Sequence, residues 1–298
     1  MIPSAFDYAA PTTLEEALGL LAAADSSGAD VKLLAGGQSL IPVMKLRLAD
    51  PSMIVDLGRI PGLSGITDDG AHLTLGAMTP HHQVATDPLI AAHVPLLSHA
   101  AATVADPQVR HRGTFGGALV HADPAGDMPA SVLATDATFM VTGPGGERAV
   151  DAADFFQGYF TTAVAEGEIL TSIRVPKYTG WGAHYEKFTR VAQQWSIVAV
   201  AAMVRVEGGV IAEARLGLTN MASTPLRATS TEQALAGCAL TEAAIAAACA
   251  HAVEGTEPAS DLNGDADYRR HLVQIIAKRA VMSAAGLRPP AGTQRAGA

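Results

Sequence analysis

The chain has 298 residues, of which 49% are hydrophobic, and a net charge of −9. This length and apolar content suit about two domains with a sizeable core. The 16% of charged residues is too low for a disordered chain, and the negative charge argues against a nucleic-acid-binding surface. No uninterrupted apolar run of about 18 residues predicts a membrane span, and no secretory signal pattern opens the chain, so we expect a cytoplasmic protein.

The first fifty residues have the pattern of a small β–α–β unit. Thr13 and Glu16 have the spacing of a helix capping box, and apolar residues at helical spacing follow. Residues 31–35 form a short β-type run that ends in two glycines. Residues 53–57 predict another strand.

The middle of the chain mixes predicted short strands and helices. Residues 72–76 alternate like a strand, and residues 88–103 have a helical pattern. The turn at 143–146 predicts a hairpin, and a proline ends a strand over 169–175.

The last third predicts an antiparallel meander followed by Ala-rich helices. The strands cover residues 184–190, 196–206 and 210–219, with a glycine turn between the second and the third. The helices cover residues 229–236, 241–254 and 267–285. We interpret Cys238 and Cys249 as buried thiols on this helical stretch; two cysteines cannot ligate an iron–sulfur cluster, so any such cluster belongs to a partner.

The strongest local feature is a strand that leads into a glycine pair: Leu33, Leu34, Ala35, Gly36, Gly37, Gln38, Ser39 and Leu40. Consecutive backbone N–H groups at such a turn can hold a pyrophosphate. A plain tight turn explains the pattern equally well. The common dinucleotide and phosphate-loop motifs are absent, and Ile41 replaces the second glycine of a nucleophile elbow.

A second glycine pair predicts a loop that approaches another part of an extended ligand, over Gly113, Thr114, Phe115, Gly116 and Gly117. Asp123 and Asp127 follow and can accept hydrogen bonds from ribose hydroxyls. With His121 they also suggest a metal site, although the spacing matches no standard one. We interpret the remaining histidines nearby as surface or capping residues: His81, His82 and His111.

Together the two glycine segments resemble the FAD-binding medium subunit of the molybdenum hydroxylase (xanthine dehydrogenase) family, most closely its aerobic carbon monoxide dehydrogenase branch. The resemblance depends on KLLAGGQSLIPVMKLRLADPSMIVDL (32–57) and DPQVRHRGTFGGALVHADPAGDMPASVLA (106–134). Weaker signs are GEILTSIRVP (167–176) and YEKFTR (185–190). The likeness extends to about residue 286.

The resemblance implies an α+β fold, with a two-lobed FAD-binding domain like that of vanillyl-alcohol oxidase and a C-terminal α+β domain of antiparallel sheet and helices. The lobes would cover residues 1–55 and 56–177, and the C-terminal domain residues 178–287. Residues 288–298 are expected to form a disordered tail.

The resemblance also implies roles for single residues. Residues 35–39 and 114–117 would wrap the FAD diphosphate, and Asp127 would bond the ribityl or ribose side. The Leu170 backbone and the Lys187 side chain would lie near the flavin ring. Val104 stands at a position that is aromatic in xanthine dehydrogenases.

Two of these side chains have two interpretations each. Lys187 can raise the flavin potential as a nearby cation, or it can be a solvated charge on a strand. Trp195 can cover the flavin edge or fill the core. In Gln194–Trp195 the chain departs from the acidic residue of its relatives but keeps the aromatic one.

The implied function is electron transfer from the [2Fe–2S] clusters of a small subunit, with a large molybdopterin subunit oxidising the substrate. A cytoplasmic dimer of heterotrimers with peripheral contact to the membrane is expected. Carbon monoxide is the first candidate substrate; a purine, heteroaromatic or aldehyde hydroxylase remains open. A self-standing FAD oxidoreductase and a scaffold with a decayed flavin site remain open as well.

Overall fold

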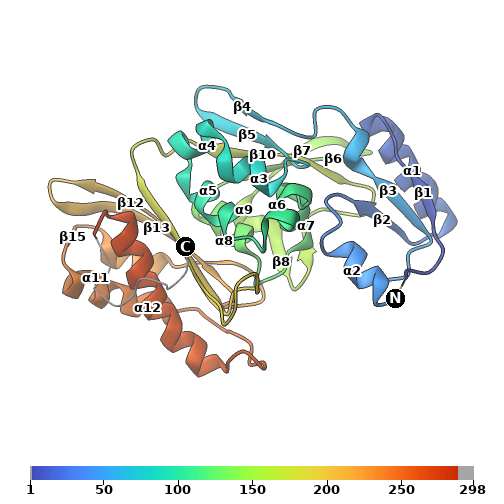
Figure 1. Cartoon of the computed structure of the whole chain (residues 1–298). Helices are drawn as coiled ribbons and strands as arrows, with labels where there is room; N and C mark the ends of the chain where they lie inside the picture. The colour runs from blue at the N-terminus through green and yellow to red at the C-terminus, as the bar shows by residue number, and fades with distance from the viewer. Residues whose placement is uncertain (1, 288–298) are drawn as a thin grey trace.

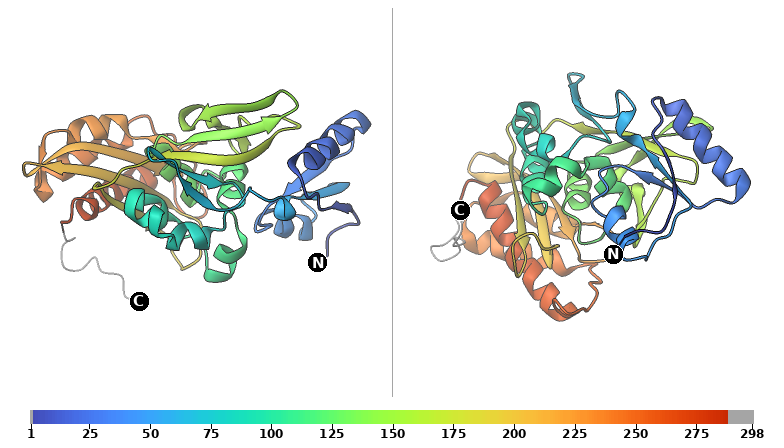
Figure 2. Two further views of the ribbon diagram at one scale, coloured as in Figure 1. Left: turned by 90° about the horizontal axis from the view of Figure 1, so that it is seen from above. Right: turned by 45° about the vertical axis from the view of Figure 1, so that its right-hand side comes forward.

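The computed structural model describes residues 2–287, so the predicted tail at 288–298 lies outside the described residues. The molecule is elongated, with an N-terminal unit at one end and the C-terminal helices at the other (Figures 1 and 2). Three main sheets follow one another along the chain. The expected α+β class is confirmed.

The N-terminal unit is a parallel sheet of three strands in the order β1-β3-β2. Its elements are β1 (Asp7–Ala9), α1 (Leu14–Ser27), β2 (Val31–Leu34), α2 (Leu40–Lys45) and β3 (Met53–Asp56). The predicted capping box is confirmed: the Glu16 amide donates to Thr13 Oγ1 at 3.1 Å, and the Thr13 amide donates to the Glu16 carboxylate at 3.3 Å. The short helix η1 (Leu57–Arg59) follows β3.

The central sheet is antiparallel, in the order β4-β5-β10-β6-β7. Its strands are β4 (Ile66–Asp68), β5 (His72–Gly76), β6 (Thr138–Gly143), β7 (Gly146–Asp151) and β10 (Ile169–Pro176). The predicted hairpin at 143–146 is confirmed as the turn between β6 and β7. The boundaries of the predicted lobes stay predictions, although β3 extends one residue past position 55.

Helices occupy the chain between β5 and β6, and some of them pack against the central or the C-terminal sheet. They are α3 (His81–Thr86), α4 (Pro88–His93), α5 (Pro95–Ala102), α6 (Pro107–Arg112), α7 (Phe115–His121) and α8 (Asp127–Ala134). The predicted helical region at 88–103 is two helices, because the pre-proline residue Val94 leaves the helical conformation. A short helix and a small hairpin follow β7: α9 (Ala152–Phe155), β8 (Phe156–Gly158) and β9 (Thr161–Thr162).

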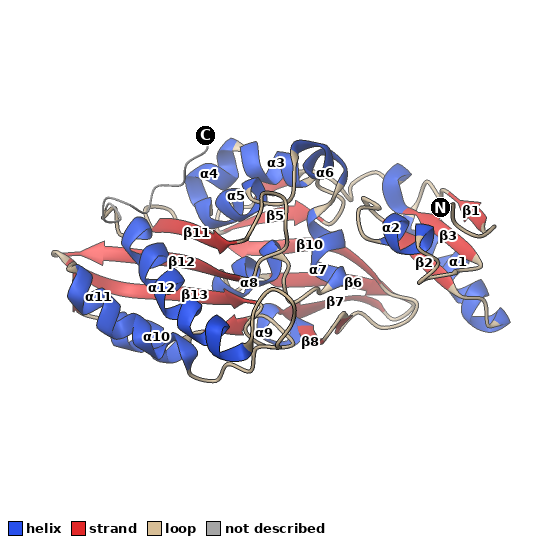
Figure 3. Ribbon diagram, turned by 60° about the horizontal axis from the view of Figure 1, so that its bottom comes forward, coloured by secondary structure: helices blue, strands red, loops and turns tan. Residues whose placement is uncertain are grey.

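The C-terminal sheet is the predicted meander, with helices on one face (Figure 3). Its elements are β11 (Gly182–Phe188), β12 (Val198–Glu207), β13 (Val210–Thr219), β14 (Leu226–Arg227), α10 (Thr229–Leu235), β15 (Cys238–Ala239), α11 (Glu242–Cys249), η2 (Ala250–Val253) and α12 (Ala266–Ala284). Gly208 and Gly209 both have positive φ, as a type I′ hairpin turn requires.

The cysteine prediction is confirmed for Cys249, which is fully buried on α11. It is wrong for Cys238, which lies in the short strand β15 and is partly exposed. Both thiols are free.

Strand β12 separates two cores because its side chains alternate between the two faces of the sheet. Ala199, Ala201 and Met203 join the core shared with the central sheet. Val198 and Val200 join the core under α10–α12. The C-terminal sheet is therefore covered by apolar packing on both faces, which joins the two halves of the molecule.

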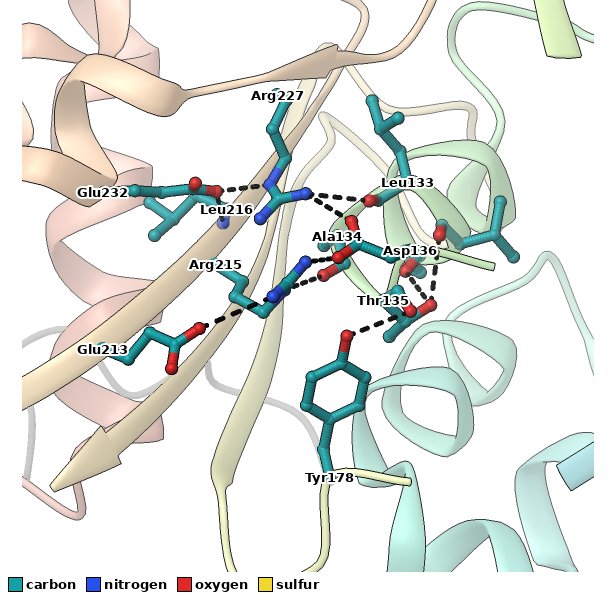
Figure 4. A network of polar contacts seen from close by, with 12 residues as sticks. Leu133, Ala134, Thr135, Asp136, Tyr178, Glu213, Arg215, Leu216, Arg227 and Glu232 are labelled. Carbon is teal, nitrogen blue, oxygen red and sulfur yellow. Dashed lines mark hydrogen bonds and ion pairs between the residues drawn. The ribbon is translucent and has the colours of Figure 1, made fainter. Parts of the chain in front are cut away.

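Polar contacts at the C-terminal end of α8 reinforce this junction (Figure 4). The Arg215 and Arg227 side chains donate to the carbonyls of Ala134 and Leu133 at 3.0 and 3.3 Å. Both guanidinium groups also pair with Asp136. Four helix carbonyls lack intrahelical donors at any C-terminus, and here β13 and β14 supply some of the missing partners.

Within residues 2–287 no helix combines the length and apolar character needed to cross a membrane.

We predict that Gly217→Ala destabilises the fold by about 1–3 kcal/mol, because its Cβ would overlap the Ala130 carbonyl oxygen where β13 meets α8. Urea denaturation measures the change. Gly145→Ala is the control, since within residues 2–287 no atom beyond its chain neighbours lies within 4 Å of the added methyl. Equal stability of the two variants would contradict a tight contact between β13 and α8.

Candidate functional site

The first glycine segment connects β2 to α2. Gly37 has a φ of +73°, a conformation that glycine adopts without cost. Among the described residues no hydrogen-bond acceptor faces the amides of Gly36, Gly37, Gln38 and Ser39. The Gln38 side-chain amide donates to the Gly36 carbonyl at 3.0 Å and fixes the turn. Four successive free amides fit an anion such as a diphosphate.

The second glycine segment is not the predicted loop, because Thr114 caps helix α7 and the glycine pair lies in its first turn. The Phe115 and Gly116 amides donate to Thr79 and Ala77 carbonyls, each at 2.8 Å. The Gly117 amide donates to Thr114 Oγ1 at 3.2 Å. These amides already have protein acceptors, so this segment offers fewer donors than the first.

The two glycine segments meet in space, as the ligand hypothesis requires. A Cβ built on Gly36 would overlap the Arg112 carbonyl oxygen. A Cβ built on Gly117 would lie 3.2 Å from Ala35 Cβ and 2.6 Å from Thr114 Oγ1. Close approach of protein to protein therefore explains these glycines, a reason that the sequence alone did not indicate.

A buried ion pair joins two of the predicted site residues. Lys187 Nζ lies 2.7 Å from Asp127 Oδ2, and the side chains are 7% and 4% exposed. Tyr185 Oη and Ser196 Oγ each donate to Asp127 Oδ1 at 3.0 Å. Lys187 also donates to the Thr103 carbonyl at 3.2 Å. The interpretation of Lys187 as a solvated charge is wrong.

Burial dominates the electrostatics of this cluster. It raises the pKa of Asp127, while Lys187, Tyr185 and Ser196 oppose the rise. Burial and the neighbouring Asp127 carboxylate raise the pKa of Tyr185 well above its usual value. The tyrosine is consequently a hydrogen-bond donor throughout the physiological range.

The other predicted residues are placed around these features. The Trp195 side chain is 53% exposed, so the core-filling interpretation is wrong. Leu170 is buried at an irregularity in β10, and Val104 is partly buried after α5. Asp123 accepts from the Ala125 amide at 2.9 Å in the turn before α8.

Other predicted site residues are buried or belong to regular elements. Phe115 is fully buried, and its amide donates to the Thr79 carbonyl. Leu33 and Leu34 belong to β2, and Leu40 begins α2. The His121 ring packs against Phe160, and within residues 2–287 no three His, Cys, Asp or Glu side chains are grouped to hold a metal ion.

His81 is not the surface or capping residue that we expected. It is 3% exposed, its amide donates to the Gly113 carbonyl, and burial lowers its pKa to about 4. His82 and His111 are exposed as expected, with stacked rings 3.9 Å apart.

We predict that Lys187→Met lowers the free energy of unfolding by about 3–5 kcal/mol, because it leaves Asp127 buried without its cation. The pKa of Asp127 in the folded variant would then lie even further above its unfolded value. The folded variant binds the proton more readily, so its stability should rise as pH falls through that raised pKa.

Urea denaturation across a pH series measures both effects. Lys278→Met is the control, because its pair with Glu242 is partly exposed and should contribute less than about 1 kcal/mol. Equal decreases in the free energy of unfolding of the two variants would show that the buried pair stabilises the fold no more than the exposed pair does.

Comparison with known proteins follows the same division of the chain. Residues 4–178 match the family model described as the FAD binding domain in molybdopterin dehydrogenase. Residues 183–284 match the CO dehydrogenase flavoprotein C-terminal domain.

Relatives match over almost the full length. The carbon monoxide dehydrogenase medium chain of Hydrogenophaga pseudoflava is 43% identical, covering 95% of this chain and 98% of the relative. The 6-hydroxypseudooxynicotine dehydrogenase complex subunit alpha of Paenarthrobacter nicotinovorans is 36% identical, covering 95% and 96%. A solved structure of carbon monoxide dehydrogenase from H. pseudoflava has a chain with a TM-score of 0.91 and 44% identity, covering 96% and 99%.

The two matched domain models, the near-complete coverage by relatives and the paired glycine segments all indicate the same family. The chain therefore belongs to the FAD-binding molybdopterin dehydrogenase family, as the FAD-binding subunit of a molybdenum hydroxylase.

Proposed function

We propose that this chain is the FAD subunit of a complex that oxidises carbon monoxide. In it, the chain takes electrons from the [2Fe–2S] clusters of a small subunit and passes them to the final acceptor. The supporting observation is the 43% identity to a carbon monoxide dehydrogenase medium chain over 95% of this chain. The relative from a hydroxypseudooxynicotine dehydrogenase complex is less similar, at 36%.

The cofactor fits the residues at the glycine segments. We propose that the amides of residues 36–39 bind the diphosphate, with Thr114 beside them. Each amide bonded to a charged group is worth about 1.5–3 kcal/mol. The pair of Asp127 and Lys187, the Leu170 backbone and the Trp195 ring are proposed to surround the flavin end. When bound, FAD supplies a carrier that exchanges electrons singly or in pairs.

The division of labour follows from the donors that this chain contains. Its two cysteines are too few for an iron–sulfur cluster. We propose a small iron–sulfur partner, a large molybdopterin partner and a dimer of the resulting heterotrimer. Two free thiols suit a reducing cytoplasm, and contact with the membrane would occur through the complex.

We predict that Gly36→Ala reduces FAD affinity at least about 10-fold, because the methyl group would push the segment away from Arg112. Flavin absorbance per chain in the purified complex measures the occupancy. Gly19→Ala, on the exposed face of α1, is the control and should keep full occupancy. Unchanged FAD content in Gly36→Ala would mean that the glycine segment is only a turn.

We also predict that carbon monoxide bleaches the flavin absorbance anaerobically only when the two partner subunits are present. The comparison uses the co-expressed complex, this chain alone, and both with an aldehyde, a purine or a nicotine-type heteroaromatic. Dithionite is the positive control for reducible flavin.

The outcomes separate the candidate functions. Bleaching of the complex by a heteroaromatic, and not by carbon monoxide, would move the chain to another branch of the family. Bleaching of the chain alone by any of these substrates would establish a self-standing flavoenzyme. Absence of FAD from the complex would favour a scaffold.

A further inference from the structure

The segment Gln193–Ile197 presents an exposed tryptophan on an otherwise anchored backbone. It lies between β11 and β12 and carries Trp195, which is 53% exposed. Gln194 Nε2 donates to Asn263 Oδ1 at 3.1 Å, and Asn220 Nδ2 donates to the Ser196 carbonyl at 2.8 Å. The side chains of Asn263 and Asn220, both distant in sequence, therefore hold the residues on either side of Trp195.

A buried arginine supplies a further anchor. Arg269 on α12 is 1% exposed, donates to the Ile197 carbonyl, and pairs with Asp261 at 2.8 Å. A charge buried to this degree needs good partners to repay its lost hydration. Here one of those partners is the backbone of the Trp195 segment.

Asp127 provides the contact on the side of the candidate cofactor site. Its Oδ1 accepts from Ser196 Oγ at 3.0 Å, while its Oδ2 pairs with Lys187 at 2.7 Å. Lys187 and the residue next to Trp195 are thus fixed by one carboxylate. Tyr185 Oη also donates a hydrogen bond to Asp127 Oδ1, at 3.0 Å.

The segment and its anchors include an unfavourable backbone conformation and buried polar atoms without hydrogen-bond partners among the described residues. Gln193 has a φ of +69°, a region that non-glycine residues seldom adopt. Gln194 Oε1 and Arg269 Nε are buried polar atoms for which the described residues offer no hydrogen-bond partner. Strain and unsatisfied atoms concentrated around one exposed side chain point to a functional position.

We propose that Asp127 is a positioning residue: through Ser196 and Lys187 it fixes the Trp195 segment and the lysine relative to each other. Both of its oxygens accept from protein donors, and its side chain is 4% exposed. The role at the flavin rests on the proposed function, but the anchoring itself does not.

The test removes only the contact to the segment. Ser196→Ala deletes the hydroxyl bonded to Asp127 and leaves the ion pair with Lys187 intact. Ser131→Ala is the matched control: its buried hydroxyl bonds the backbone carbonyl of Asp127 within α8. Ser196→Thr keeps a hydroxyl and tests for rescue. The background is Trp181→Phe, which leaves Trp195 as the sole tryptophan.

We expect amide hydrogen exchange across residues 193–197 to become about 10-fold faster in Ser196→Ala, with stronger acrylamide quenching of Trp195 fluorescence. Ser131→Ala should change neither, and Ser196→Thr should recover both. These measurements use the full chain without FAD, so they remain valid if the proposed substrate is wrong. In the FAD-loaded complex, Ser196→Ala should alter the visible circular dichroism of the flavin.

Two results would overturn the proposal. Exchange and quenching that match the Ser131→Ala control would show that Asp127 does not hold the segment. A looser segment with unchanged flavin dichroism would show that the anchoring has no consequence at the cofactor.

Discussion

The buried carboxylate of Asp127 is the constraint on which the arrangement of the two domains depends. A carboxylate removed from water needs donors on both oxygens, because its lost hydration costs several kcal/mol. Asp127 begins α8, within the part of the chain that matches the FAD-binding domain, but Lys187, Tyr185 and Ser196 all lie in or beside the C-terminal sheet. The C-terminal domain must therefore dock on α8 before the carboxylate is satisfied, which couples the packing of the two domains to a single charge.

At the other end of α8 the helix supplies acceptors, and the C-terminal sheet supplies the donors. The helix carbonyls accept from Arg215 and Arg227 of that sheet. A negative side chain at the N-terminus and cations at the C-terminus each match the helix dipole. Gly217 allows β13 to approach the backbone of α8 between these two ends. Sheet and helix are thus held at both ends and in contact at the middle, so side chains from the two domains keep fixed relative positions.

The sequence predicted what short-range patterns determine. The capping box at Thr13, the hairpin at 143–146 and the glycine turn at 208–209 all depend on residues within a few positions of one another. The predictions were wrong or incomplete where contacts between residues distant in sequence determine the structure. Helix α7 begins in a glycine-rich stretch because Thr79 and Ala77, far earlier in the chain, accept from its first amides. The partner of Lys187 lies 60 residues away, and no local pattern marks it. His81 is buried, and its amide donates to the carbonyl of Gly113, which is again a contact between distant residues.

The two glycine segments look equivalent in sequence, but their backbone amides differ in whether they already have acceptors within the protein. In the second segment, the amides of residues 115–117 already donate to acceptors in Thr79, Ala77 and Thr114. The small residues of this segment therefore allow close packing and the start of a helix. In the first, the amides of residues 36–39 keep their hydrogen-bonding capacity while packing holds the backbone in place. An anion would bind there against a net protein charge of −9. Charges more than about 8 Å away are screened at physiological salt, whereas each amide contact adds about 1.5–3 kcal/mol. Local donors outweigh the global charge, and only the first segment supplies several of them in succession.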